Sequence, residues 1–227
     1  MKKFCKILIV LIWVFAILGG LMVEGTLLYK KYVSGTEDAD HGSFTYSTEA
    51  AVDSIECDMS YGNLELVPGD AWSVRFEDVY IPMAEAFTEG STLKIQLNTE
   101  NDFVLFGWKI GVDMDFDFSK EPVVTVTFPA GSQLELVNIQ TGHGSVSIEG
   151  LDTGLFVCQT GIGSISLKDC RLTEESASQL VFGTYSSENV MYRFGKVHVT
   201  AGTASIGVDE TSRLADVETK VRLGCIK

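Results

Sequence analysis

Apolar and polar residues alternate along most of the chain, and one stretch of this pattern recurs almost unchanged. Residues 141–148, Thr-Gly-His-Gly-Ser-Val-Ser-Ile, reappear 19 positions later as residues 160–167, Thr-Gly-Ile-Gly-Ser-Ile-Ser-Leu. Alternation with period two indicates β-strands, because successive side chains of a strand leave opposite faces of the sheet. A repeat of about twenty residues is typical of folds that stack similar layers. Each repeat is predicted to hold a strand, a glycine turn, a second strand and a turn at glycine or aspartate.

Weaker copies of the repeat lie on both sides of this central pair. Upstream, the matching positions are Ile55, Cys57, Gly62, Leu64 and Leu66; downstream, they are Val197, Val199, Gly202, Ile206 and Val208. Residues 217–225 resemble a worn terminal copy, whereas residues 171–195 align poorly and are expected to hold a rung with an insertion. The pattern predicts an all-β fold, a single β-solenoid or β-helix-like domain over residues 44–227 with rungs of about twenty residues. An antiparallel β-sandwich with two similar hairpins is the alternative interpretation.

Each rung needs a tight turn and an apolar interior. The turns are assigned to Gly142, Gly144, Gly161 and Gly163, because glycine reaches positive φ without a clash at Cβ. The aliphatic side chains expected to face the interior after these turns are Val146, Ile148, Ile165 and Leu167. In this stacking Glu149 lies beside Lys168 of the next rung, a small contribution to register. Burial of the aliphatic ladder is expected to dominate the stability.

The beginning of the chain has a different character. Residues 7–23 form an unbroken apolar run, and lysines flank it on both sides. A bilayer-spanning helix needs about 20 residues, so the run, extended to Leu28, is predicted to be a transmembrane helix. A cleaved signal peptide is the alternative, although no Ala-x-Ala site follows Val23.

The predicted helix sets the organisation of the chain. It comprises residues 7–28, after a cytoplasmic N-terminus at residues 1–6 and before a flexible linker at residues 29–43. Three lysines precede the apolar run and two follow it, a slight bias that places the N-terminus in the cytoplasm. We therefore expect a single-pass protein of the cell membrane whose C-terminal domain is extracytoplasmic.

Charge and cysteine usage narrow the classes of partner. The net charge is −14, and a surface this acidic repels phosphate backbones, which argues against nucleic-acid binding. The five cysteines show no metal-ligand spacing. Cys57, Cys158 and Cys170 fall on interior positions of the repeat, where buried thiols are expected. A disulfide between Cys158 and Cys170 is the alternative.

Two segments in the middle of the chain have an unusual composition. Residues 112–118 alternate strictly and place Asp113, Asp115 and Asp117 on one strand face. A half-buried strand with an acidic solvent face is favoured, and a weak calcium site is the alternative, since Ca²⁺ takes carboxylate oxygens. The aromatic residues 103–108 are expected to lie in the core or over the end of the stack; an exposed cluster would be a docking patch.

No arrangement typical of catalysis or of a cofactor site emerges. None of His41, His143 and His198 has a neighbour at metal-ligand spacing. Ser145 lies close to His143, but the Gly-x-Ser-x-Gly motif of a strand-to-helix nucleophile turn is missing from the chain. The Gly-x-Gly turns do not precede predicted helices, so they do not form a phosphate-binding site. No catalytic residue and no cofactor are therefore predicted.

The residues now described resemble a known family. The run Val-Thr-Val-Thr-Phe-Pro at 124–129, then a strand, then the paired Thr-Gly-x-Gly-Ser rungs, is similar to the bacterial putative-adhesin domain family of unknown function. The resemblance covers roughly residues 50–227, although many members have a Ser-Gly-Asp turn where this chain has Gly-x-Gly-Ser. It implies a β-solenoid at the bacterial cell envelope, often preceded by a membrane helix and without known catalytic residues.

Three functions are compatible with these observations. The first is a membrane-anchored, extracytoplasmic binding or scaffold module, non-catalytic and adhesin-like, that contacts an envelope protein or a glycan. The second is a regulatory partner in envelope-stress signalling. The third is a glycan-active β-helix enzyme, which would need acidic residues that converge in a groove.

Overall fold

The computed structural model describes residues 41–97, 102–105, 108–111, 121–208 and 217–226. The chain divides into two units, Met1–Ala39 and Asp40–Lys227, and the described residues all belong to the second. The predicted cytoplasmic N-terminus and transmembrane helix lie outside the described residues, as does most of the predicted linker. Within the described ranges, no helix has the length and hydropathy of a membrane span.

The all-β prediction is confirmed. The described residues form a series of strands, which a short 3-10 helix, η1 (Ile81–Met83), interrupts. The strands are β1 (His41–Ser47), β2 (Ser54–Tyr61), β3 (Asn63–Gly69), β4 (Ser73–Tyr80), β5 (Ala84–Glu89), β6 (Thr92–Leu97), β7 (Asp102–Leu105), β8 (Trp108–Gly111), β9 (Val123–Pro129), β10 (Gln133–Glu149), β11 (Asp152–Lys168), β12 (Arg171–Val208) and β13 (Val217–Ile226). β1 begins inside the predicted linker, so residues 41–43 are strand rather than stalk.

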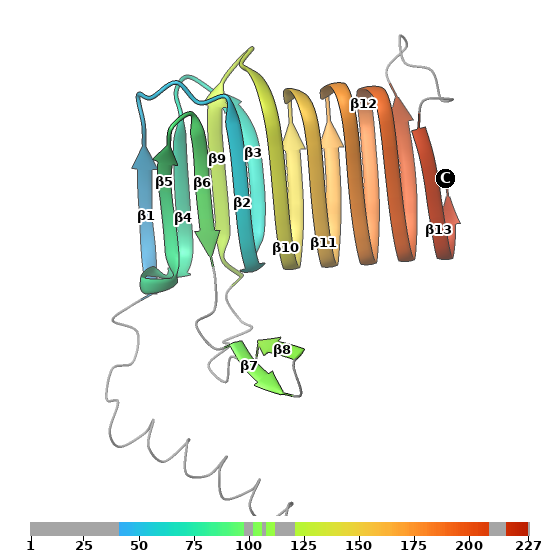
Figure 1. Cartoon of the computed structure of the whole chain (residues 1–227), viewed down its shortest axis with the longest axis horizontal. Helices are drawn as coiled ribbons and strands as arrows, with labels where there is room; N and C mark the ends of the chain where they lie inside the picture. The colour runs from blue at the N-terminus through green and yellow to red at the C-terminus, as the bar shows by residue number, and fades with distance from the viewer. Residues whose placement is uncertain (1–40, 98–101, 106–107, 112–120, 209–216, 227) are drawn as a thin grey trace, which may run out of the picture. The chain divides into compact units, whose positions relative to one another are not determined.

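β10 and β11 are each one winding of a stack, and β12 continues it through two further windings, with glycine turns at Gly183 and Gly202; the strands lie side by side in Figure 1. β10 and β11 pair in parallel along their whole length, with Val146 opposite Ile165 and Gly144 opposite Gly163. β11 pairs in the same way with β12, and β12 pairs with β13. The solenoid-like stacking predicted from the paired repeat is therefore present in this part of the chain.

Each winding has a first arm, a glycine turn, a second arm and a second turn. The second turn is at glycine or aspartate as predicted, since Gly150 has φ 68° and Asp169 has φ 53°. Asn189 takes the same position in the following winding with φ 53°. Asparagine and aspartate tolerate this left-handed conformation better than other residues with a Cβ.

The upstream copy of the repeat is one winding built from two strands. β2 pairs in parallel with the first arm of β10, and β3 pairs with its second arm. Gly62 lies between β2 and β3 with φ 106°, which corresponds to the glycine turn of the later windings. The predicted match of Ile55 and Leu64 to the repeat is confirmed, since these residues pair with Val137 and Val146.

The remaining N-terminal strands follow the predicted solenoid only in part. The strands form two walls. The first wall consists of the first arms of the windings, followed by β2, β6 and β5; the second wall consists of the second arms, followed by β3, β9, β4 and β1. β5 is antiparallel to β6, and β4 is antiparallel to both β9 and β1. β6 nevertheless pairs in parallel with β2, and β9 pairs in parallel with β3. The prediction of a single solenoid over residues 44–227 therefore holds only in part, because β1, β4 and β5 are antiparallel to their neighbours. The hairpin β5–β6 turns at Gly90, a connection only antiparallel strands can use.

One hydrophobic core fills the space between the two walls. It is continuous from Ile55 and Val74 at the N-terminal end to Val199 and Ala204 near the C-terminal end. Val146, Ile148, Ile165 and Leu167 are each at most 1% exposed, as expected for the aliphatic ladder. Burial on this scale contributes roughly 25 cal/mol for each Å² of apolar surface, which makes packing the main source of stability.

Residues 171–195 form a rung with an unusual interior. One extra residue enters between the pairs Thr153–Leu172 and Phe156–Ser176, which confirms the predicted insertion. Beside the aliphatic Leu172, Leu180 and Val190, several interior positions here hold serine or tyrosine: Ser176, Ser178, Ser187, Tyr185 and Tyr192. The hydroxyls of the two tyrosines form a buried hydrogen bond of 2.8 Å. The large phenol rings fill the volume that the small serines leave.

The cysteines of the core are thiols. Cys57, Cys158 and Cys170 are free and buried, so the disulfide alternative for Cys158 and Cys170 does not apply to this structure. Burial raises the pKa of Cys158 to about 12 and that of Cys170 to about 11. The core thiols therefore stay protonated and pack as small apolar side chains at neutral pH.

The segment between β6 and β9 contains the short strands β7 and β8. β7 and β8 pair antiparallel with Leu105 opposite Trp108. The side chains of the aromatic cluster at 103–108 lie outside the described part. The calcium candidates Asp113, Asp115 and Asp117 are also outside the described residues.

Candidate functional site

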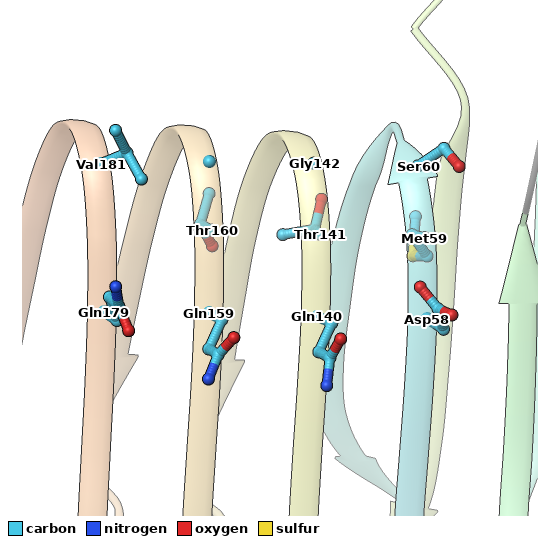
Figure 2. Close-up of a pocket in the computed structure, with 11 residues that line it drawn as sticks. Asp58, Met59, Ser60, Gln140, Thr141, Gly142, Gln159, Thr160, Gln179 and Val181 are labelled. Atoms are coloured by element: carbon cyan, nitrogen blue, oxygen red, sulfur yellow. The ribbon is translucent and has the colours of Figure 1, made fainter. Parts of the chain in front are cut away.

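A groove of about 420 Å³ crosses the outer face of the first wall close to the glycine turns (Figure 2). It runs along the stack, across β2, β10, β11 and the beginning of β12, rather than along any single strand. Its lining residues are Asp58, Met59, Ser60, Gln140, Thr141, Gly142, Gln159, Thr160, Gly161, Gln179 and Val181. The groove therefore takes one short segment from each of four successive layers.

A ladder of glutamines forms one side of the groove. Gln140 pairs with Gln159 and Gln159 pairs with Gln179, so the three amides occupy the same position in successive windings. Asp58 continues the row in β2, opposite Gln140. All four side chains are exposed and form a row in Figure 2. Adjacent members are separated by the strand spacing of ~4.8 Å, and each amide offers two donors and an acceptor.

Glycines form the floor of the groove. A Cβ at Gly142 would lie 2.6 Å from the carbonyl oxygen of Ser60, and one at Gly161 would lie 2.4 Å from that of Gly142. Side chains are thus excluded here by the close approach of neighbouring strands. Ser60 and Val181 stand at the same level in the flanking strands and limit the floor at its two ends. Because Gly142 and Gly161 have no side chain, neighbouring strands approach each other closely and the surface of the groove above them stays open.

A second column of glycines forms the turn beside this floor. Its members have φ between 134° and 150° and are Gly144, Gly163, Gly183, Gly202 and Gly224. A Cβ on Gly163 would lie 1.8 Å from the carbonyl oxygen of Gly144. Any larger residue would collide with the backbone of the preceding layer, so this column requires glycine.

An exposed apolar ladder lies at the tips of the glycine turns. Tyr61 pairs with His143, His143 with Ile162, and Ile162 with Phe182. Ile162 is 50% exposed and Phe182 is 53% exposed, and Val181 in the groove is also exposed. The groove thus has polar amides on one side and apolar side chains close by. Ligand sites commonly combine an apolar surface with a few polar groups that fix orientation.

Ion pairs between windings lie outside the groove. Lys168 donates to Glu149 at 2.8 Å, as predicted from the repeat, and Lys196 donates to Glu175 at 2.7 Å. The bond to Glu149 raises the pKa of Lys168, so this lysine stays protonated. The groove itself is lined by one carboxylate, Asp58, and by no basic side chain. Such a lining suits a neutral ligand with many hydroxyl groups better than a phosphate or another polyanion.

The residues first considered for chemistry do not meet in this groove. Among the described residues, no group of three or more His, Cys, Asp and Glu is placed to hold a metal ion. His41 lies in β1 beside Tyr80, and His143 is exposed at a turn tip. His198 is half-buried, and its Nε2 is enclosed without a hydrogen-bond partner in the described structure.

The glutamine ladder was not predicted as a site. Gln140 and Gln159 were visible in the sequence as polar residues between apolar ones, and the same amide recurs at Gln179. The signal was the repetition of one functional group at one repeat position. The extra residue before Ser176 concealed the third member, because it shifts the period from 19 to 20 residues.

The comparisons with known proteins agree with the fold. The family described as Toastrack DUF4097 matches residues 73–219. A crystal structure described as a putative cell adhesion protein from Clostridium sporogenes ATCC 15579 is similar, with a TM-score of 0.51 and 8% identity, over 82% of this chain and 97% of that chain. At this identity the similarity shows the fold alone. No curated protein matches the chain at a significant level.

Two further structures were found with lower scores. A putative adhesin from Bacteroides fragilis NCTC 9343 has a TM-score of 0.36 and 13% identity, over 84% of this chain and 97% of that chain. A putative adhesin from Parabacteroides distasonis ATCC 8503 has a TM-score of 0.26 and 12% identity, over 83% of this chain and 95% of that chain. The match of the family model over residues 73–219 supports the predicted resemblance to a family of unknown function.

Proposed function

The chain belongs to the Toastrack DUF4097 family, and on this premise we propose that it is a non-catalytic binding module of the bacterial cell envelope. In this proposal residues 7–28 anchor the chain in the membrane and the β domain is extracytoplasmic. The ligand is an extended glycan that lies in the groove of the first wall. The adhesin descriptions of similar structures support a surface-binding role for the fold.

The single observation that carries the proposal is the register of the glutamine ladder. Three identical amides repeat at the strand spacing of ~4.8 Å, which is close to the length of one sugar residue in an extended polysaccharide. A chain that lies along the stack would therefore present similar hydroxyl groups to Gln140, Gln159 and Gln179 in turn. The glycine floor allows a sugar ring to approach the backbone, and Phe182 and Ile162 offer apolar surface nearby.

The proposal that the module is non-catalytic rests on the number of carboxylates that line the groove. Most glycoside hydrolases use a pair of carboxylates on the two sides of the scissile bond. Asp58 is the one carboxylate that lines the groove, and it lies at one end of the amide ladder. This arrangement favours recognition over hydrolysis. Measurable release of reducing sugar by the purified chain would contradict this part of the proposal.

The binding experiment uses the compact unit Asp40–Lys227 and insoluble cell-wall polysaccharide. Gln159→Ala removes the central amide, and its expected effect is binding at least about tenfold weaker, a loss of ~1.4 kcal/mol. Gln133→Ala is the matched control, because Gln133 is an exposed glutamine of β10, the strand that holds Gln140, but does not line the groove. Equal binding by Gln159→Ala and the unaltered protein would refute the assignment of the groove, and so would the absence of binding to any envelope glycan.

The topology is tested separately in cells. A C-terminal tag on an extracytoplasmic domain should be digested by protease added to intact cells. Protection in intact cells together with digestion in lysates would contradict the proposed orientation. The size of the mature chain in the same experiment distinguishes a retained anchor from a cleaved signal peptide.

The exposed apolar ladder favours a second candidate function, a regulatory partner in envelope-stress signalling. Ile162 and Phe182 would then contact a protein rather than the apolar face of a sugar. The variant Phe182→Ser separates the two functions: a protein contact should be lost while binding to polysaccharide, carried by the amides, is reduced only moderately.

A further inference from the structure

The last described strand leaves one edge of the stack open. β13 pairs in parallel with β12 on one side, from Gly195–Val217 to Ala204–Ile226, and no described strand pairs with its other side. Two apolar side chains of this strand are strongly exposed: Leu223 is 71% exposed and Ile226 is 55% exposed. Val221 pairs with the buried Val199, so β13 continues the inner face of the stack without a layer to cover it.

The edges at the other end of the stack carry features that hinder further pairing. β1 has a register shift between Gly42 and Phe44, and such irregularities protect edge strands. β5 is short, follows Pro82 and exposes Glu85 and Glu89. Negative charges of this kind repel a second acidic chain. β13 has a regular register with β12 and contains no proline. Its exposed charges, Glu218, Lys220 and Arg222, are of both signs, so they do not uniformly repel a second copy of the same strand.

The charges of β13 are self-complementary. Glu218 and Lys220 lie on either side of Thr219, and both side chains are exposed. In an antiparallel pair of two β13 strands centred on Thr219, each Glu218 is directly opposite Lys220 of the second copy. Opposite charges in this cross-strand position are stabilising, whereas any register shifted to place Lys220 opposite Lys220 is not.

The charge of the whole chain also selects this edge. With a net charge of −14, two copies repel each other over most of their surfaces. β13 is an exception, since it has one acid, Glu218, against the two basic residues Lys220 and Arg222. A contact at β13 therefore avoids bringing acidic strands of two copies together.

From these observations we infer that β13 is a docking surface for a second copy of this chain, which pairs antiparallel with it about Thr219 and forms a symmetric dimer. A two-fold contact of this kind uses the same patch on both copies and closes after two subunits. It also places Val221 of each copy opposite Val217 of the other. The inference is independent of the ligand proposed for the groove, which lies on the outer face of the first wall.

The first test measures the mass of the full chain in detergent micelles by sedimentation or light scattering. The unaltered chain should be a dimer at micromolar concentration. Lys220→Glu and Glu218→Lys each place like charges opposite each other, and each should raise the dimer dissociation constant at least tenfold. The double variant Glu218→Lys/Lys220→Glu restores opposite charges and should restore the dimer. A monomeric unaltered chain, or a double variant no better than the single ones, would overturn the inference.

The second test locates the centre of the contact. In a background with Cys5→Ser and Cys225→Ser, Thr219→Cys should form a disulfide-linked dimer under mild oxidation, because opposed residues of an antiparallel pair are within reach of a disulfide. Lys220→Cys is the control, since its opposite position is Glu218. Equal or better cross-linking by Lys220→Cys would contradict the proposed register. A ladder of higher oligomers would indicate head-to-tail stacking of β13 on β5 and would also refute the symmetric dimer.

Discussion

The substitution Gly163→Ala probes the packing of the stack in the column of turn glycines, where neighbouring backbones approach closely. Gly163 has φ 148°, a conformation that residues with a Cβ rarely adopt, and an added Cβ would lie 1.8 Å from the carbonyl oxygen of Gly144. The backbone strain costs roughly 1–3 kcal/mol. The collision is with backbone, so it is relieved only by separating two layers, which costs a further ~1–3 kcal/mol. We expect a loss of about 4 kcal/mol in the free energy of unfolding.

Gly90→Ala is the matched control for this prediction. Gly90 also has positive φ, at 63°, but no atom lies within 4 Å of the position that a Cβ would take. Its expected cost is that of the left-handed conformation alone, ~1–2 kcal/mol. Urea denaturation of the unit Asp40–Lys227, followed by circular dichroism, measures both variants under the same conditions. Equal midpoints for Gly163→Ala and Gly90→Ala would refute the close backbone contact between layers.

Three further predictions concern the interior. Val146→Asp buries an unpaired carboxylate at a side chain that is 1% exposed and should cost several kcal/mol, whereas Ser147→Asp on the exposed face should cost little; an unchanged melting temperature for Val146→Asp would place residue 146 outside the core. Burial raises the pKa of Cys158 from its ordinary value near 9 to about 12. The contribution of the buried thiol to the free energy of unfolding is therefore complete below pH 9 and is lost as the pH rises toward 12. We expect a loss of about 2–3 kcal/mol by pH 11 and a flatter pH dependence of unfolding for Cys158→Ala; identical slopes would contradict the raised pKa. Tyr185→Phe removes the buried bond to Tyr192 and should cost ~1–2 kcal/mol, and the double variant with Tyr192→Phe should cost less than the sum of the single ones in a double-mutant cycle.

Those parts of the fold that depend on repeated local patterns could be predicted from the sequence. Val146 and Ile165 stand at equivalent positions of two near-identical segments, and the pairing of these residues follows directly from the period. Glu149 and Lys168 became neighbours for the same reason. The period fixes which residues lie beside each other once strands stack in parallel, because each layer repeats the conformation of the previous one.

Other parts depend on packing that no local pattern reveals. The rung at residues 171–195 has Ser178 and Tyr185 facing each other across the core, a combination of small and large residues that hydrophobic periodicity does not recognise. The antiparallel order of β4, β5 and β1 depends on which wall each connection reaches, and the alternation within β4 is the same for either wall. The sequence therefore did not reveal the neighbours of these strands, and it placed the beginning of β1 in the linker.

The candidate site could be predicted from the sequence only in part. The glycines that form its floor were predicted as turn residues, for the conformational reason that applies to Gly144 and Gly163. Gly142 and Gly161 are needed for a different reason, because they allow the strands to approach and leave the groove open. The amide ladder becomes a site only when three windings are in register, which is a property of the assembled stack rather than of any one segment.

Cross-linking between adjacent windings tests the stacking on which the groove depends. In a Cys225→Ser background, Gln140→Cys and Gln159→Cys occupy paired positions of β10 and β11, so they should form an intrachain disulfide in high yield under mild oxidation. Gln140→Cys combined with Gln179→Cys should not, because these residues are two strand spacings apart, ~9.6 Å. The account predicts the first bond and not the second; failure of the first pair to close, or equal closure of both, would contradict it.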